Sequence, residues 1–448
     1  MSGNRQANTA SSPLRAPVLF AVLAILFVLE GTLNNSLFSG SWNTSLAILN
    51  MGLISAIMAL GVNMQWGYAG LFNSGVVGFL AIGGLAPVLI SLPPVEGAWA
   101  AGGPRLLLSL AVGLGALVLA AQVWGRMPKG RLRGLAVATV LIVGFFLFRT
   151  IFDPAVTAIE ANQSARFGNI GGLGLPVLLA WPVGGLFAAA AAWGVGKVAL
   201  GLRSDYLAIA TLGIGEIIVA VLRNEEWLAR GVKNITSIPR PVPYEIALQR
   251  NPQFQDFAAS WGFTVAEASG IWVKLCYMLL FLVVLLLLIL LAELALKSPW
   301  GRMMRAIRDN ETAAEAMGKN VTSRHLQVFI IGSAVIGMAG AMMVTLDGLM
   351  APTGYNPLRY TFLIWVMVIV GGSGNNWGSV LGAVLIWFIW IKVEVWGPQL
   401  IGVLTLPLPD GTVKQQLLGS APHMRFIAMG VVLLLVLRFS PRGLLPEK

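Results

Sequence analysis

Few side chains in this sequence are of the types that bind metals or form covalent bonds. Cys276 is the single cysteine, and the two histidines, His325 and His423, lie at the ends of apolar segments without a second ligand at helical spacing. A disulfide needs a second cysteine, and a structural zinc site needs about four ligands. The sequence therefore predicts no disulfide, no metal site and no cofactor, and it predicts structural roles for both histidines.

Motifs for nucleotide binding and hydrolysis are also missing from the sequence. The phosphate-binding loop of P-loop ATPases ends in Gly-Lys followed by Ser or Thr, whereas here Gly-Lys is followed by Val198 or by Asn320. The sequence contains no Gly-x-Ser-x-Gly elbow, His-Glu-x-x-His helix or paired-carboxylate constellation. We therefore predict that the chain is not an enzyme, has no catalytic residues and does not bind ATP by this route.

Four ionisable residues inside apolar stretches need an explanation, because a charge inside a membrane is costly. Glu30, Glu293 and Lys392 lie near the ends of their stretches, where we expect the side chains to reach the membrane surface. Glu216 lies deep within its stretch. Our hypothesis is that Glu216 faces the interior of a helix bundle and affects transport, and the alternative is a purely structural hydrogen bond.

The composition indicates whether the chain folds in water or in a membrane. Of the 448 residues, 57% are hydrophobic and 11% are charged, and the mean hydropathy is +0.79. Soluble domains carry about a quarter charged residues, so the chain belongs in a membrane. The net charge of +11 resides in short loops and forms no stripe on a soluble face, which argues against nucleic acid as a partner.

Apolar segments of about 20 residues, the length that crosses a bilayer as a helix, recur along the whole chain. The sequence therefore predicts an all-α, polytopic integral membrane helical bundle of about 10–12 transmembrane or re-entrant helices. The candidate spans are Ala16–Leu33, Leu46–Met64, Val76–Leu92, Leu106–Trp124, Leu135–Ile151, Leu175–Leu200, Tyr206–Leu222, Ile271–Leu296, Leu326–Leu346, Tyr360–Val370, Val380–Trp396 and Ile427–Leu437.

Two glycine-rich segments, Gln65–Gly75 and Gly371–Asn376, interrupt this apolar pattern. Irregular backbone at membrane depth is tolerated beside protein or a water-filled path, and paired broken segments point to a substrate path. The alternative is that both are ordinary turns at the membrane surface. The predicted path residues, with Glu216, are Gly67, Tyr68, Gly70, Asn73, Ser74, Gly75, Gly371, Gly372 and Gly374.

Basic residues in the short loops predict the orientation of the chain. Because Lys and Arg are retained on the cytoplasmic side, we expect the basic loops at 126–133 and 298–324, and both termini, to be cytoplasmic in a bacterial inner membrane. Residues 1–15 are predicted to be a disordered cytoplasmic tail, since no cleavage site of a signal peptide follows it. The proline-containing stretch 223–268 is then an external loop that could meet an external partner.

The basic loop 298–324 has the local signals of two short helices. Ser298 followed by Pro299 starts the first, Asn310 can cap the second, and Gly318 ends it. Small residues of the second helix, Ala313, Ala314 and Ala316, would let another protein approach closely. The alternative is a solvated loop whose arginines bind anionic lipid.

This loop resembles the cytoplasmic coupling loop of the branched-chain amino-acid permeases of ABC importers, the LivM type. The motifs, in the order of that family, are Gly301-Arg302, Arg305-Ala-Ile-Arg308, Asn310-Glu311 and Ala313-Ala-Glu-Ala-Met-Gly318. The resemblance continues from about Met51 through Gly67-Tyr-Ala-Gly70, Asp205–Glu216, Gly371-Gly-Ser-Gly374 with Trp377-Gly378, and Pro441-Arg-Gly-Leu-Leu445. Residues 95–162 have no recognised counterpart and are a predicted insertion of two helices.

The resemblance implies a permease domain at 16–448 that carries branched-chain amino acids with ATP hydrolysed by partner subunits. The implied partners are a second homologous permease, two ATP-binding subunits, a periplasmic binding protein and membrane lipid. The coupling residues that it implies are Arg302, Arg305, Arg308, Glu311, Ala313, Ala314, Glu315 and Gly318. A permease for urea or short amides is the alternative substrate class. An ion-coupled secondary transporter is the alternative mechanism, although the spans offer few carboxylates for it.

Overall fold

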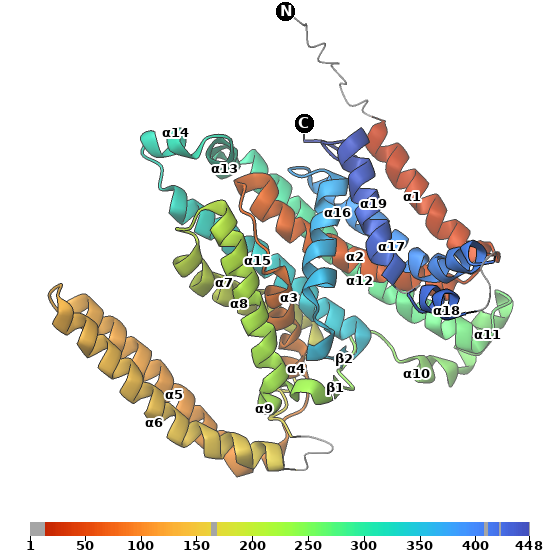
Figure 1. Ribbon diagram of the computed structural model, residues 1–448. Coiled ribbons are helices and arrows are strands. Elements are labelled where there is room, and N and C mark those ends of the chain that lie inside the picture. The colour runs from red at the N-terminus through yellow and green to blue at the C-terminus, as the bar shows by residue number, and fades with distance from the viewer. Residues whose placement is uncertain (1–13, 163–167, 407–410, 421–422, 448) are drawn as a thin grey trace, which may run out of the picture.

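The computed structural model describes residues 14–162, 168–406, 411–420 and 423–447, so most of the predicted tail, residues 1–13, lies outside the described part. Helices dominate the fold (Figure 1). The first half contains α1 Arg15–Thr32, α2 Trp42–Asn63 with its π-helical end η1 Met64–Tyr68, α3 Val76–Gly84, α4 Ala86–Ser91, α5 Glu96–Arg126, α6 Arg131–Ala161, η2 Val177–Leu179, α7 Ala180–Ala199, α8 Ser204–Asn224, α9 Glu226–Ala229, η3 Gly231–Lys233 and β1 Ile235–Thr236. The second half contains α10 Glu245–Gln249, α11 Pro252–Ser260, α12 Val265–Lys297, α13 Pro299–Asp309, α14 Glu311–Ala316, α15 Val321–Asp347, β2 Leu349–Met350, η4 Pro352–Gly354, η5 Leu358–Phe362, α16 Leu363–Gly371, α17 Asn376–Leu404, α18 Thr412–Gly419 and α19 Met424–Phe439.

The described residues confirm a polytopic helical membrane protein. Nine helices are long and apolar enough to cross a membrane, or ten if the bent pair α18–α19 forms one span. Two shorter apolar stretches, Val76–Ser91 and Leu358–Gly371, follow irregular backbone. These shorter stretches explain why the hydropathy pattern alone suggested up to twelve candidate spans.

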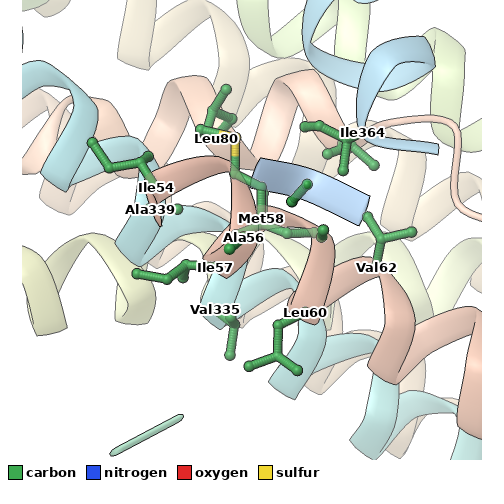
Figure 2. Close-up of a cluster of buried hydrophobic side chains, with 14 of the residues drawn as sticks. Ile54, Ala56, Ile57, Met58, Leu60, Val62, Leu80, Val335, Ala339 and Ile364 are labelled. Atoms are coloured by element: carbon green, nitrogen blue, oxygen red, sulfur yellow. The ribbon is translucent and has the colours of Figure 1, made fainter. Parts of the chain in front are cut away.

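The centre of the bundle is formed by α2 and α15, which pack against each other; α15 also packs against α3 and α7, and α2 against α12 and α17. Ile54, Ile57 and Leu60 of α2 and Val335 and Ala339 of α15 belong to this core (Figure 2). The helices approach closely through glycine: a Cβ on Gly340 would lie 2.1 Å from the carbonyl oxygen of a residue in α3. Lipid provides no hydrophobic drive for helix association, so such close van der Waals contact between small residues is what holds membrane helices together.

Helices α5 and α6 form a hairpin that projects from the bundle (Figure 1). A small separate cluster around Leu106, Ala155, Ile159 and Trp227 joins its base to α9. Both helices of the segment 95–162 are long and apolar enough to cross a membrane; that this segment is an insertion of two spans remains a prediction.

The bundle has two different ends. Helices α13 and α14 lie at one end, together with the start of α1 and the end of α19, and β1, β2 and α9 lie at the other (Figure 1). The segment 223–268 consists of short helices and the strand β1, which pairs antiparallel with β2. Both ends of the chain's described part therefore lie on the side of the basic loop 298–324.

The prediction that Glu30 and Lys392 reach the membrane surface is wrong. Lys392 Nζ lies 2.7 Å from Glu30 Oε2, and the two side chains are 4% and 0% exposed. This buried ion pair joins α1 to α17. Glu293 of α12 is half-buried and accepts a hydrogen bond of 2.9 Å from the side-chain amide of Asn376. Each residue has a polar partner from a distant part of the chain, which removes the need to reach water.

Candidate functional site

The basic loop folds as the sequence predicted, into two short helices. Ser298 caps α13, where its hydroxyl oxygen accepts from the Gly301 N–H, and Asn310 caps α14, where its side-chain oxygen accepts from the Ala313 N–H at 2.9 Å. Gly318 follows α14 with a positive φ of 76°, a conformation that favours glycine. Helix caps of this kind depend on adjacent residues, which is why local sequence was sufficient to predict them.

The two helices present different faces to the bundle and to solvent. Helix α13 buries Gly301, Met304 and Ile307 and exposes Arg302. In α14, Ala313, Glu311 and Glu315 are exposed, and Met317 just after it is 80% exposed. Ala314 is different, because it is half-buried against the core of its own chain. The small surface available to another protein is therefore formed by Ala313 and Ala316 beside Met317, and not by Ala314.

Arg308 connects α13 to the interior of the bundle. Its Nη1 donates to the carbonyl oxygen of Gly67, at the π-helical end of α2, and lies 2.9 Å from Glu447 Oε2 near the C-terminus. Burial lowers the pKa of the Arg308 guanidinium, but the hydrogen bond and charge of Glu447 and the charge of Asp309 raise it by more. The side chain therefore remains charged and joins three separate segments. The nearby Arg305 donates to the Leu296 carbonyl at 3.4 Å.

The two predicted glycine-rich breaks meet at this junction, although they are far apart in sequence. A Cβ on Gly67 would lie 2.5 Å from the backbone nitrogen of Gly374. Helix α16 ends at Gly371, and Gly372 and Gly374 have positive φ values of 115° and 81°. The C-terminal segment covers this turn, because the Leu445 N–H donates to the Gly371 carbonyl at 2.9 Å. The segment Gly371–Asn376 is thus a tight turn at the α13–α14 end.

A buried network of amides lies beneath Arg308. The Tyr68 hydroxyl and the Asn63 side-chain nitrogen both donate to Asn376 Oδ1, and the Asn376 nitrogen donates to Glu293. Asn63 Oδ1 accepts from the Gly374 N–H at 2.8 Å. This network links α2, α12 and α17. A polar network in a low-dielectric interior is stable only when the hydrogen bonds of its members are made. We therefore expect a movement of Gly67 to displace all three helices.

Residues 70–75 cross from the junction into the bundle without helical structure. Asn73 is fully buried: its nitrogen donates to Gln65 at 2.9 Å and its oxygen accepts from the Gly75 N–H at 2.9 Å. The Gln65 nitrogen in turn donates to Phe329 O and Ser333 Oγ of α15, both at 3.0 Å. The hydrogen bonds of Asn73 are therefore used in holding the unwound backbone. Gly70 and Ser74, at its start and near its end, are more accessible.

The end of this unwound segment packs closely against α8. The Ser74 N–H donates to Thr211 Oγ1 at 3.0 Å, and a Cβ on Gly75 would lie 2.3 Å from the Thr211 carbonyl. Gly215 forms the next contact, opposite Gly78. Glu216 is exposed on the other face of α8. The hypothesis that Glu216 faces the bundle interior is therefore wrong for the packing within this chain: Gly215 faces inward, whereas Gly213 and the Glu216 carboxylate face out.

Several residues of the junction were not singled out from the sequence: Asn63, Asn376, Glu447 and Thr211. Amides within otherwise apolar stretches were the available signal for Asn63 and Asn376, whereas nothing in the local sequence marks Glu447 as a partner of Arg308. In the described part of the chain, no group of three or more His, Cys, Asp or Glu side chains is arranged to hold a metal ion.

The chain is similar in sequence to known transport proteins. The family described as "Branched-chain amino acid transport system / permease component" matches residues 44–437. The chain belongs to this family. This permease is 28% identical over 292 residues to the "High-affinity branched-chain amino acid transport system permease protein LivM" of Salmonella typhimurium, which covers 64% of this chain and 61% of that protein.

A second relative spans more of the permease. The "Probable branched-chain amino acid transport permease protein LivM" of Methanocaldococcus jannaschii is 25% identical over 416 residues, which cover 90% of this chain and 93% of that one. The "Fructose import permease protein FrcC" of Rhizobium meliloti matches 31% of the chain at 22% identity. No solved structure matches the permease. The chain is thus a multi-pass membrane transport permease, of the kind that the resemblance of its loop implied.

Proposed function

We propose that this chain is the permease subunit of an ABC importer for branched-chain amino acids in a bacterial inner membrane. A second, homologous permease would complete the pore, two ATP-binding subunits would dock on α13 and α14, and a binding protein would deliver substrate at the opposite end. The observation that carries the proposal is the contact of Arg308 with Gly67. It connects a surface-exposed helix pair to the broken helix α2 inside the bundle.

In this proposal α13 and α14 transmit force. A displacement of α13 by the ATP-binding subunits moves Arg308, which pulls on the π-helical end of α2 and on the turn at Gly374. The unwound residues 70–75 allow α3 to shift relative to α2, since backbone outside a helix can change conformation without breaking helical hydrogen bonds. Because Ser74 and Gly75 contact Thr211, the movement reaches α8. Alternating access follows from the tilt of α8 and α3.

The outer face of α8 is where we place the substrate path. Glu216 lies on this face among exposed apolar residues such as Ile209 and Ile217. A carboxylate in contact with lipid tails is strongly disfavoured, so this face is best explained if it meets the second permease or a water-filled path. The predicted path residues then separate by position. Glu216 flanks the path, Ser74 and Gly75 support α8 from its inner side, and Gly67 and Gly371–Gly374 belong to the coupling junction.

Docking on α14 is tested with Met317→Asp, because Met317 is apolar and 80% exposed. Exposed methionine is enriched at protein interfaces, and an anchor of this kind contributes about 2 kcal/mol, so the variant should bind the ATP-binding subunits about thirtyfold more weakly in copurification. Gly130→Asp, in the turn between α5 and α6, is the matched control, since a Cβ there meets nothing within 4 Å. Normal assembly and uptake by Met317→Asp would contradict the proposed docking.

Reconstitution separates the proposal from an ion-coupled mechanism. Vesicles that contain the permeases, the ATP-binding subunits and the binding protein should accumulate L-leucine only when ATP is present inside. Uptake by the chain alone, driven by an ion gradient, would contradict the ABC mechanism. Uptake of urea in place of L-leucine would leave the mechanism intact and change the substrate.

A further inference from the structure

A small cavity of about 190 Å³ lies at the end of the bundle opposite α13 and α14, between the end of α15, strand β2 and the start of η5. Its polar lining comes from Asp347, Arg359 and Tyr355, and its apolar lining includes Met343, Val344 and Leu349. The strand β2 marks its position in Figure 1. One carboxylate, one guanidinium and an aliphatic wall thus surround a space large enough for a ligand the size of a single amino acid.

Arg359 is the unusual member of this cavity. Its guanidinium lies over the rings of Tyr360 and Trp387, 5.1 and 5.5 Å from their centroids, and its Nε is buried without a hydrogen-bond partner. Among the described residues, the Arg359 side chain makes no hydrogen bond. It also forms no ion pair with Asp347 or with another carboxylate of this part of the chain. The aromatic faces stabilise the cation and hold it in place, but they leave its N–H donors free for a ligand.

The other arginines near this cavity have their donors occupied by the protein. Arg223 of α8 donates to the carbonyls of Pro352 and Tyr355 at 3.3 and 2.9 Å, and Arg240 pairs with Glu245 at 3.1 Å. Arg223 thereby fixes the backbone that forms one wall of the cavity. The structure therefore distinguishes arginines that hold the fold from Arg359, whose hydrogen-bonding capacity is unused.

We propose that this cavity is a receiving site for the free amino acid on the side where the binding protein releases it. Arg359 binds the α-carboxylate, Asp347 binds the α-ammonium group, and the wall formed by Met343, Val344 and Leu349 contacts the aliphatic side chain. Paired opposite charges that do not neutralise each other match a zwitterion, and they match neither urea nor a sugar, which carry no charge. The inference rests on the proposed function and deepens it by naming the residues that select a zwitterion.

The cavity also adjoins the moving part of the proposed mechanism. The Tyr355 hydroxyl packs against Gly84 at the end of α3, where a Cβ would lie 2.3 Å from that oxygen. Helix α3 begins directly after the unwound residues 70–75. A ligand in the cavity would therefore lie next to α3, the helix that the coupling junction displaces.

Binding of radiolabelled L-leucine to the purified full-length chain in detergent tests the site. The wild type should bind L-leucine, and Arg359→Gln and Asp347→Asn should each weaken binding about tenfold, the effect of losing one hydrogen bond to a charged group. The matched control is Arg250→Gln, an exposed arginine at the same end that lines no part of the cavity. Arg359→Lys retains the charge and should retain part of the affinity.

Ligand analogues assign the two charges without relying on the stability of a variant. L-leucinamide lacks the carboxylate, so it should bind the wild type about tenfold more weakly than L-leucine and should bind Arg359→Gln no more weakly than L-leucine does. N-acetyl-L-leucine lacks the ammonium group and should behave in the same way towards Asp347→Asn. Absence of L-leucine binding to the wild type up to about 10 mM, or equal binding of L-leucine and both analogues, would overturn the proposal.

Three further outcomes separate this site from the proposed function. If the assembled importer takes up L-leucine with an unchanged KM in Arg359→Gln, the receiving site is wrong and the importer stands. If the wild-type importer does not transport L-leucine, the proposed substrate itself fails. A variant that weakens association with the binding protein but leaves L-leucine binding to the chain unchanged assigns Arg359 to docking, and this result also overturns the receiving site.

Discussion

The buried ion pair between Glu30 and Lys392 allows a quantitative test of the fold. The Lys392 ammonium lies 2.7 Å from Glu30 Oε2, and Ser39 Oγ donates to the other carboxylate oxygen at 2.7 Å. Glu30→Gln leaves the ammonium buried without its counter-charge, which costs about 3–5 kcal/mol in buried pairs. An ordinary lysine can release its proton at pH 7 for about 4–5 kcal/mol. The destabilisation caused by Glu30→Gln therefore cannot exceed this value, because beyond it the lysine would become neutral.

The opposite variant should be milder. Lys392→Met leaves the carboxylate buried, but the hydroxyl and N–H of Ser39 continue to donate to it, so we expect a loss of about 2–3 kcal/mol. The double variant Glu30→Gln/Lys392→Met removes both charges and keeps the volume similar. Because apolar replacement of a buried pair is often neutral, its stability should lie within about 1 kcal/mol of the wild type.

Reversible unfolding of the purified chain in mixed micelles, titrated with SDS and followed by tryptophan fluorescence, measures these free energies. Lys233→Gln is the control, since its pair with Glu226 at 2.5 Å is partly exposed and pairs open to solvent contribute at most about 1 kcal/mol. The reasoning fails if either single variant is as stable as the wild type, or if the double variant loses the sum of the two single losses. Additive losses would mean that the two charges do not interact.

Three further predictions concern packing, coupling and the path. Gly340→Val should destabilise the chain by about 1–3 kcal/mol, because a Cβ there meets the Leu80 carbonyl at 2.1 Å, whereas Gly115→Val, with nothing within 4 Å, should not; equal melting temperatures would contradict this packing. Arg308→Ala should leave the ATP-binding subunits attached but reduce uptake per ATP hydrolysed about tenfold, since one charge-assisted contact contributes about 1.5 kcal/mol; an unchanged ratio would exclude Arg308 as the link. Glu216→Gln should unfold like the wild type, because the side chain is exposed, and should lower uptake by the assembled importer; full uptake would remove Glu216 from the path.

The local sequence was sufficient to predict those features that depend on neighbouring residues. The caps at Ser298 and Asn310 and the positive φ at Gly318 follow from side chains within four positions, and the boundaries of α13 and α14 follow from them. Hydropathy predicted the spans for a similar reason, since the length of an apolar run decides whether it can cross a bilayer. The breaks after Gln65 and Gly371 were visible because glycines and amides interrupt such runs.

What the sequence could not determine is which face of each helix is buried. In a soluble protein the polar face marks the outside, but a helix in lipid is apolar on all sides, so periodicity does not distinguish packing from lipid contact. For this reason Glu216 was predicted to face inward and Ala314 to face outward, and both predictions were wrong.

The sequence also could not predict which residues from distant parts of the chain are in contact. Glu30 and Lys392 are 362 positions apart, and Arg308 and Glu447 are 139 apart. The sequence by itself determined that this is a helical membrane permease with a structured basic loop. Only the tertiary structure decided which charges neutralise each other and which, like Arg359, remain available for a ligand, because those contacts depend on how the helices pack and not on the residues beside them.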